Sequence, residues 1–331
     1  MMTLEAFLKE WQNSEDRVLV HTSGSTGSPK PLWVEKRRME ASARITCDFL
    51  QLQPGDTALL CMPLDYIAGK MVVVRSIVRH LRLISVPPSG HPLKGLAETP
   101  TFAAMVPMQV YNSLQVAEER DRLRAIRHLI IGGGAIDDGL AGQLKDFPNA
   151  VWSTYGMTET LSHIALRRLN GDEASLWYTP FASVSVCLNA DGCLVIDAPE
   201  VCAHQLTTHD IAELSADGKQ FRILGRKDNV IDSGGIKIQI EEVERLLRPY
   251  LFVPFIITKV SDAKYGEAVT LLYEHTSLSV SALREICDLH LPRFWSPRHY
   301  FEVPSLPLTE TGKPARKRAE EMAEERLRSM E

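Results

Sequence analysis

The chain has 331 residues, of which 44% are hydrophobic and 24% are charged, and this is the balance of an ordinary globular protein. A formal net charge of -5 gives no electrostatic reason to expect a nucleic-acid partner. No stretch approaches the roughly 18 uncharged apolar residues of a membrane span, and the N-terminus lacks the basic start and apolar run of a signal peptide. We therefore expect a cytoplasmic protein with no membrane span.

The first two thirds of the chain alternate short apolar runs with helix-like segments. The apolar runs predict buried strands at residues 17–21, 57–61, 83–86, 101–106, 128–131 and 151–154. Amphipathic segments between them predict helices at residues 36–52, 68–79 and 107–120. This alternation is typical of an α/β domain with a mainly parallel sheet, which binds its ligands at the carboxyl ends of the strands.

The pattern changes twice toward the C-terminus. Short strands and turns between residues 177 and 223 predict an antiparallel β subdomain. Beyond it, a compact α+β unit is predicted, with helices at 240–247, 279–290 and after Pro314, and strands at 255–260 and 268–274. We therefore predict a large N-terminal domain over residues 1–226 and a small C-terminal domain over residues 227–331.

A segment rich in glycine and hydroxyl residues follows the first predicted strand. Residues 22–30 contain two glycines, five hydroxyl side chains and a terminal lysine. Such a segment can wrap a polyphosphate, because backbone amides and hydroxyls donate hydrogen bonds and the lysine adds a positive charge. A flexible turn is the alternative. The predicted phosphate-binding residues are Thr22, Ser23, Gly24, Ser25, Thr26, Gly27 and Lys30.

Two further motifs follow predicted strands. Residues 152–160 read Trp-Ser-Thr-Tyr-Gly-Met-Thr-Glu-Thr, and residues 131–135 read Ile-Gly-Gly-Gly-Ala. Consecutive glycines allow the backbone to approach a ligand closely, although a tight turn would use them equally well. A carboxylate such as that of Glu159 is the ligand that Mg²⁺ prefers beside substrate phosphates.

These motifs, in this order, resemble the signatures of the adenylate-forming superfamily, which includes acyl-CoA synthetases, adenylation domains and luciferases. The resemblance implies that Tyr155 stacks on adenine, that Thr158 binds a phosphate oxygen and that Glu159 holds Mg²⁺. It also implies that ATP, Mg²⁺ and coenzyme A are used. The implied adenine- and ribose-binding residues are Gly133, Gly134, Ala135, Ser153, Thr154, Tyr155, Gly156, Asp210 and Arg226.

The resemblance extends to the C-terminal third of the chain. It places a hinge at Lys227 or Asp228, and it places the path of the pantetheine arm of coenzyme A at Gly234 and Gly235. Lys313, in the run Leu-Thr-Glu-Thr-Gly-Lys, resembles the catalytic lysine of the family. A cation at this position stabilises the charge that develops at the α-phosphate.

The run at residues 63–69 and the run at 162–166 look most like those of compact bacterial o-succinylbenzoate–CoA ligases of menaquinone synthesis. The acyl-pocket residues that this implies are Tyr66, Gly69, Lys70 and Arg75. Such a substrate keeps a second carboxylate, and Lys70 or Arg75 would bind it, although solvated helix-surface positions are the alternative for both.

Other interpretations remain open. The thiol acceptor would be a carrier protein instead of coenzyme A in a carrier-directed adenylation enzyme, and a regulatory relative would bind nucleotide without catalysis. Only 20 residues precede His21, fewer than is typical of the family. We expect either a naturally compact member or a fragment, with a partner subunit as one replacement for the missing lobe. The sequence leaves the oligomeric state open, a homodimer included.

Overall fold

The computed structural model describes residues 2–21, 31–134, 136, 138–309 and 313–330. Its largest sheet runs in the order β4-β3-β5-β6-β7-β8-β9. The first five strands of this order are parallel, β8 pairs antiparallel with β7, and β9 pairs antiparallel with β8. Its strands are β3 (Thr57–Leu60), β4 (Arg82–Ser85), β5 (Phe102–Met105), β6 (His128–Ile131), β7 (Ala150–Gly156), β8 (His163–Arg168) and β9 (Thr179–Pro180).

The central strands are apolar on both faces because each face packs on a different hydrophobic core. Side chains alternate between the two faces of a strand. Ala58 and Phe102 accordingly belong to one cluster, whereas Leu59 and Ala103 belong to another. Strands β3 and β5 are fully buried, while β4 lies at the sheet edge and is partly exposed. The predicted parallel α/β architecture is therefore confirmed.

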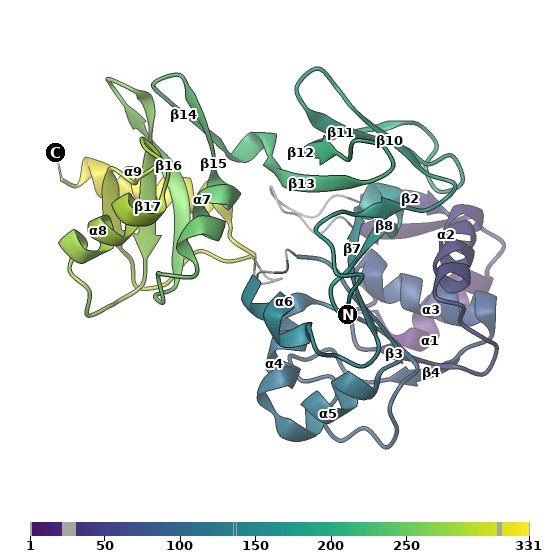
Figure 1. Cartoon of the computed structure of the whole chain (residues 1–331). Coiled ribbons are helices and arrows are strands. Elements are labelled where there is room, and N and C mark those ends of the chain that lie inside the picture. The colour runs from purple at the N-terminus through teal and green to yellow at the C-terminus, as the bar shows by residue number, and fades with distance from the viewer. Residues whose placement is uncertain (1, 22–30, 135, 137, 310–312, 331) are drawn as a thin grey trace.

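Helices cover this sheet. They are α1 (Leu4–Gln12), α2 (Lys36–Phe49), α3 (Ile67–Arg79), α4 (Pro107–Gln115), α5 (Ala117–Ala125) and α6 (Asp138–Leu144). Helices α2 and α3 pack against each other on the same side as α1, as Figure 1 shows. The single helix predicted over residues 107–120 is wrong. The chain leaves the helical conformation at Val116, which has φ -112° and ψ 120°, and the second helix starts there.

An antiparallel sheet follows the large sheet, as predicted. It runs in the order β10-β11-β12-β13. Its strands are β10 (Ser185–Leu188), β11 (Cys193–Asp197), β12 (Leu206–Leu214) and β13 (Phe221–Arg226). A separate antiparallel pair, β1 (Arg17–His21) and β2 (Pro31–Glu35), brings His21 opposite Pro31. The short η1 (Thr158–Thr160) joins β7 to β8.

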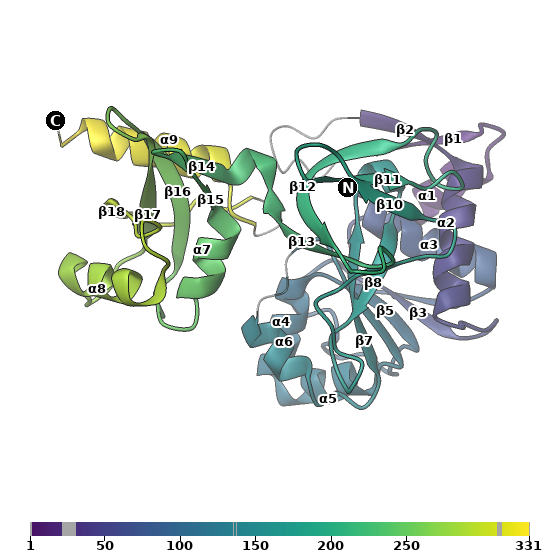
Figure 2. The ribbon, with the colours of Figure 1, turned by 45° about the horizontal axis from the view of Figure 1, so that its top comes forward.

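The C-terminal part forms a mixed sheet with its own helices. Its elements are β14 (Val230–Ser233), β15 (Ile236–Gln239), α7 (Ile240–Leu247), β16 (Phe255–Asp262), β17 (Gly266–Tyr273), α8 (Val280–His290), β18 (His299–Glu302) and α9 (Arg316–Arg328). Helix α8 begins at a cap in which the Ser279 side chain accepts a hydrogen bond from the Ala282 amide. In Figures 1 and 2 this part lies beside the N-terminal part and joins it after β13.

The buried hydrophobic clusters also divide at the junction that follows β13. The two N-terminal clusters include buried residues up to Phe221, and the two C-terminal clusters start at Ile231. The short η2 (Lys227–Asn229) lies between them and has no buried residue. We propose that the domain boundary lies here, between residues 226 and 227. No helix within the described ranges is both long and apolar enough to cross a membrane.

Candidate active site

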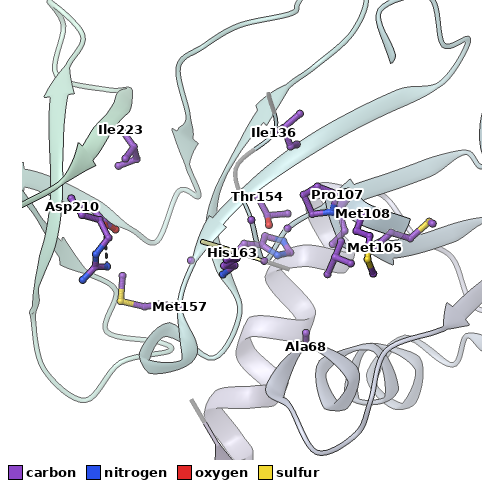
Figure 3. A pocket seen from close by; sticks show the side chains of 18 of the residues that line it. Ala68, Met105, Pro107, Met108, Ile136, Thr154, Met157, His163, Asp210 and Ile223 are labelled. Atoms are coloured by element: carbon purple, nitrogen blue, oxygen red, sulfur yellow. Dashed lines mark hydrogen bonds and ion pairs between the residues drawn. The ribbon is translucent and has the colours of Figure 1, made fainter. Parts of the chain in front are cut away.

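A cleft of about 3300 Å³ lies where the large sheet, the antiparallel sheet and the C-terminal part meet. Figure 3 shows Asp210 and Ile223 on the antiparallel-sheet side, Met105, Pro107 and Met108 on the other, and Thr154 and His163 between them. The sequence-predicted residues that line it are Tyr66, Arg75, Gly133, Gly134, Thr154, Gly156, Thr158, Glu159, Asp210, Arg226, Asp228 and Lys313. Residues from five predicted motifs thus share one cleft.

The carboxylate of Glu159 has no partner among the described residues. It lies in η1, just after the end of β7, and its side chain is exposed in the cleft. Within the described residues its carboxylate makes no hydrogen bond and no ion pair, whereas the neighbouring Thr158 is buried. An unengaged carboxylate beside a ligand cleft fits Mg²⁺, which usually bridges one or two carboxylates to substrate phosphates.

Asp210, one of the implied ribose-binding residues, lies at the centre of a hydrogen-bonded group. Tyr155 donates from its hydroxyl to Asp210 Oδ2 at 2.7 Å, and Arg226 Nη1 lies 3.3 Å from Asp210 Oδ1. Burial and the negative charge of Asp210 raise the pKa of the Tyr155 phenol, so it remains a donor. The Tyr155 ring packs against Phe221 and Tyr178 and does not line the cleft. Its contact with adenine stays a prediction.

Lys313 reaches the cleft from the C-terminal part. Its backbone is fixed by Thr309, which donates its amide to the Lys313 carbonyl at 2.7 Å and accepts the Lys313 amide on Oγ1 at 3.1 Å. A Cβ built on Gly134 would lie 3.9 Å from Lys313 Cε. Burial, with the nearby positive charge of Arg226, lowers the pKa of the Lys313 ammonium. The lysine therefore lies beside the glycine-rich segment.

Three residues after Lys313, a buried ion pair anchors the start of α9. Arg316 donates to both oxygens of Glu244, at 2.6 and 2.7 Å, and to the Ile257 carbonyl at 3.2 Å. Glu244 also accepts the Ile257 amide at 3.0 Å. Two parallel bonds between a guanidinium and a carboxylate fix direction as well as distance. This pair therefore joins α7, β16 and α9 close to the segment that carries Lys313.

The glycines of two motifs are required by close backbone contacts. A Cβ on Gly156 would lie 2.3 Å from the Ser162 carbonyl oxygen, and one on Gly132 would lie 2.3 Å from Thr154 Oγ1. Gly133 has φ +78°, which lies in the left-handed region that favours glycine. Gly132 therefore lets the glycine-rich segment lie against Thr154 of β7, and Gly156 lets the end of β7 lie against the backbone of Ser162.

Arg75 lines the cleft and is 2% exposed. Its Nη2 donates to Ser162 Oγ and lies 3.4 Å from Thr46 Oγ1, while its buried Nε has no hydrogen-bond partner in the part of the chain that the structure describes. Burial lowers the pKa of this guanidinium to about 10. Among the described residues no carboxylate pairs with it, so the protein buries a cation without its counter-ion. A buried charge of this kind is costly unless a partner binds it.

The structure corrects three of the predicted placements. Lys70 does not face the cleft: its Nζ donates to the Leu19 carbonyl at 2.6 Å and lies 3.8 Å from Glu10 of α1. Gly69 packs on the chain before α3, where a Cβ would lie 2.4 Å from the Pro63 carbonyl oxygen. Ser153 is buried and bonds to the Tyr178 hydroxyl at 2.9 Å. These three residues support the walls and do not line the cleft.

Several predicted residues lie outside the described part of the chain: Thr22, Ser23, Gly24, Ser25, Thr26, Gly27, Lys30 and Ala135. The residues that flank the predicted phosphate loop, His21 and Pro31, both line the cleft. Gly234 and Gly235 lie in the turn between β14 and β15, away from the cleft lining, with φ +62° and +85°. Their contact with coenzyme A stays a prediction.

The predicted hinge residues are held by ion pairs. Lys227 Nζ bonds to Asp191 of the β10–β11 turn at 2.8 Å, and Asp228 lies 2.9 Å from both His209 Nδ1 and Arg226 Nη2. These pairs are half exposed and are therefore weak.

No motif pointed to Thr46, His163 or Gln239. His163 is buried beside Arg75, and Gln239 donates to the Arg226 carbonyl at 2.9 Å. Ser162 and His163 are adjacent in a run that served only as a mark of resemblance, and Thr46 lies in an unremarkable helix. Thr46 and His163 gain a role only because they lie together in space, beside Arg75.

Comparison with known proteins agrees with this geometry. A family model described as AMP-binding enzyme matches residues 6–196. An acyl-CoA synthetase (AMP-forming)/AMP-acid ligase II-like protein of Dyadobacter fermentans shares 31% identity at a TM-score of 0.64, covering 95% of this chain and 91% of that one. The chain therefore belongs to the AMP-binding enzyme family, which confirms the resemblance that the motifs carry and makes the chain an adenylate-forming enzyme.

Two more distant relatives bear related names. The 2-succinylbenzoate–CoA ligase of Salmonella typhimurium is 26% identical over 317 residues, which cover 91% of this chain and 67% of that protein. The O-succinylbenzoate coenzyme A synthetase of Bacillus subtilis, solved with ATP and magnesium ion, has a TM-score of 0.77 at 22% identity, covering 91% of this chain and 69% of that one. The second likeness is one of fold alone.

Proposed function

We propose that the chain is an ATP-dependent acid–thiol ligase that forms an acyl-AMP and then transfers the acyl group to coenzyme A. The best-supported acid is o-succinylbenzoate. The observation that carries this proposal is the buried cation of Arg75, which lacks a carboxylate partner among the described residues and lies in the same cleft as Glu159, Asp210 and Lys313.

The first half-reaction joins the acid to AMP. The substrate carboxylate attacks the α-phosphorus of ATP, a new P–O bond forms, and the bond to the departing pyrophosphate breaks. The Lys313 ammonium stabilises the charge that develops on the phosphate oxygens. Glu159 would hold Mg²⁺, which neutralises phosphate charge when it is bound. Asp210 and Arg226 would hold the ribose hydroxyls, one as acceptor and the other as donor.

In the second half-reaction a thiol has to reach the acyl group of the acyl-AMP. A thiolate attacks the acyl carbon of the mixed anhydride, the C–S bond forms, and the C–O bond to AMP breaks. Lys313 lines the cleft next to Gly134, and its withdrawal would open that side to a thiol. A turn of the C-terminal part about Lys227 and Asp228 would withdraw it.

The choice of acid follows from charge. When one carboxylate of o-succinylbenzoate is activated, the other remains ionised and needs a cation in a buried site. Arg75 provides that cation with its planar array of donors, and the mutual pairing of substrate and guanidinium offsets the cost of burying both. The names of the two distant relatives agree with this acid.

Pyrophosphate release over a panel of acids tests the proposal. With ATP and Mg²⁺ we expect release with o-succinylbenzoate and little release with benzoate or octanoate. Addition of coenzyme A should then yield the thioester. Release with a monocarboxylate alone, or with none of the acids, would overturn the choice of substrate. Transfer to a phosphopantetheinylated carrier protein, with none to coenzyme A, would overturn the choice of acceptor.

A further inference from the structure

A closed ring of hydrogen bonds includes Arg75, Ser162 and His163, which line the cleft, together with Thr46. Arg75 Nη2 contacts Ser162 Oγ and Thr46 Oγ1. The same two hydroxyls contact the two ring nitrogens of His163, with Ser162 Oγ 3.2 Å from Nδ1 and Thr46 Oγ1 3.2 Å from Nε2. The four side chains come from α2, α3 and the start of β8, and His163 closes the ring on the side opposite Arg75.

The direction of each bond follows from the donors and acceptors that these groups have. Arg75 can only donate, so both hydroxyl oxygens accept from it. Thr46 already donates its hydroxyl hydrogen to the Ser42 carbonyl at 3.1 Å, so Thr46 must accept from His163 Nε2. Ser162 keeps its own hydrogen and donates it to His163 Nδ1. The ring is therefore satisfied by one form of the imidazole, the neutral Nε2–H tautomer.

The charge of the surroundings favours the same form. His163 is 7% exposed. Burial, together with the adjacent positive charge of Arg75, lowers the pKa of this imidazole well below its ordinary value. A protonated ring would place a second cation against Arg75, and it would turn Nδ1 into a donor that competes for the Ser162 oxygen.

We propose that neutral His163 is a positioning residue, which orients Ser162 and Thr46 so that Arg75 is held ready for the second carboxylate of the substrate. This inference rests on the proposed function. His163 itself need not touch the reacting atoms. Its contribution is to fix the rotamers of the two hydroxyls, whose lone pairs hold Nη2 of the guanidinium.

Two substitutions separate this role from packing. In His163→Gln the amide oxygen accepts from Ser162 and the amide nitrogen donates to Thr46, so both bonds of the ring are kept. In His163→Leu a side chain of comparable bulk makes neither bond. We expect the KM for o-succinylbenzoate to rise about tenfold or more in His163→Leu, which is the scale of one to two lost hydrogen bonds between neutral groups. In His163→Gln it should stay within about threefold of the unsubstituted protein, the size of a sub-kilocalorie change.

The matched substrate is 4-oxo-4-phenylbutanoate, which differs from o-succinylbenzoate only in lacking the ring carboxylate. Its KM should be the same in all three proteins, and the KM for ATP should not change. An equal KM for o-succinylbenzoate in His163→Leu and His163→Gln would overturn the inference, as would a rise for both acids alike. Absence of activity with o-succinylbenzoate in the unsubstituted protein would instead overturn the proposed function.

A measurement without substitution covers the case in which His163→Leu does not fold. Nitrogen NMR of the histidine side chains distinguishes the two neutral tautomers and the protonated ring. We expect one histidine to remain in the Nε2–H form at pH values where an ordinary histidine is protonated, and its signal to be absent in His163→Gln. A protonated ring or an Nδ1–H tautomer for that histidine at neutral pH would overturn the inference.

Discussion

Lys313 is placed by its backbone and not by a partner for its ammonium group. Its amide and carbonyl both pair with Thr309, whereas Nζ has no hydrogen bond to the described residues. Replacing Lys313 with Ala should lower the rate of acyl-AMP formation by about 10²–10³-fold, because one preorganised charge is lost. Thioester formation from supplied acyl-AMP should be spared. The two half-reactions are followed by pyrophosphate release and by thioester absorbance.

The control for this variant is Lys317→Ala, which removes an exposed lysine from the first turn of α9, shortly after Lys313. Both half-reactions should be unchanged in the control. If Lys313→Ala slows both half-reactions equally, the assignment of Lys313 to the first step is wrong.

The lowered pKa of Lys313 predicts a pH dependence. Only the protonated ammonium stabilises phosphate charge, so acyl-AMP formation should be at full rate below this pKa and fall as the pH rises through it. The fall should begin below the range of an ordinary lysine. Lys313→Arg should shift it to higher pH, because a guanidinium stays charged. An alkaline limb in the pH–rate profile that is identical in both proteins would contradict this explanation.

At the scale of elements, the junction of β7 with β8 sets the shape of the cleft. Gly156 lies against the backbone of Ser162 and His163, at 2.3 and 2.5 Å from a Cβ placed there. Gly156→Ala should therefore force the start of β8 away, lower the free energy of unfolding by about 1–3 kcal/mol and reduce adenylation at least tenfold. Urea unfolding and pyrophosphate release measure the two effects.

Gly142→Ala is the matched control, since α6 offers its Cβ open space with nothing within 4 Å. It should raise the free energy of unfolding by up to about 1 kcal/mol through helix propensity, with activity unchanged. Similar losses in both variants would argue against a special role for the β7–β8 junction.

The elements themselves were largely predictable from the sequence. Strands such as β1 and β6 have the predicted bounds, because short apolar runs flanked by polar residues leave few alternatives. The break at Val116 was not predictable, since the charged residues that follow continue a helical pattern. Nor was the direction of Lys70: it lies on α3 with Arg75, and only the position of α1, a distant segment, decides that Lys70 is buried under it.

The same limit applies to the site. The resemblance to the family predicted Glu159, Asp210 and Lys313 in one cleft, because their motifs follow the family's order along the chain. The ring around Arg75 joins residues 46, 75, 162 and 163, and no local pattern links positions so far apart. Such contacts depend on how whole elements pack, which sequence periodicity alone does not determine.

At the scale of the whole molecule, the two parts of the chain meet at η2. If they turn about Asp228 between half-reactions, a proline there should hold the arrangement that this structure has. Asp228→Pro should therefore retain acyl-AMP formation and lose thioester formation from supplied acyl-AMP by at least tenfold, because proline fixes φ. Separate assays of the two half-reactions measure this.

Asp228→Ala removes the same carboxylate and its pairs with His209 and Arg226 but leaves φ free. It should retain both half-reactions. Loss of thioester formation in both variants would assign the effect to the carboxylate and not to the hinge.

Arg226 has a consequence that reaches beyond its own strand. Its guanidinium is shared between Asp210, at the ribose position, and Asp228, at the pivot. Its positive charge also contributes to the lowered pKa of the Lys313 ammonium. A nucleotide that hydrogen-bonds to Asp210 or Arg226 competes with those contacts. Binding of AMP would then weaken the contacts at the pivot, and its release would restore them. Rotation of the C-terminal part would therefore depend on whether the nucleotide site is occupied.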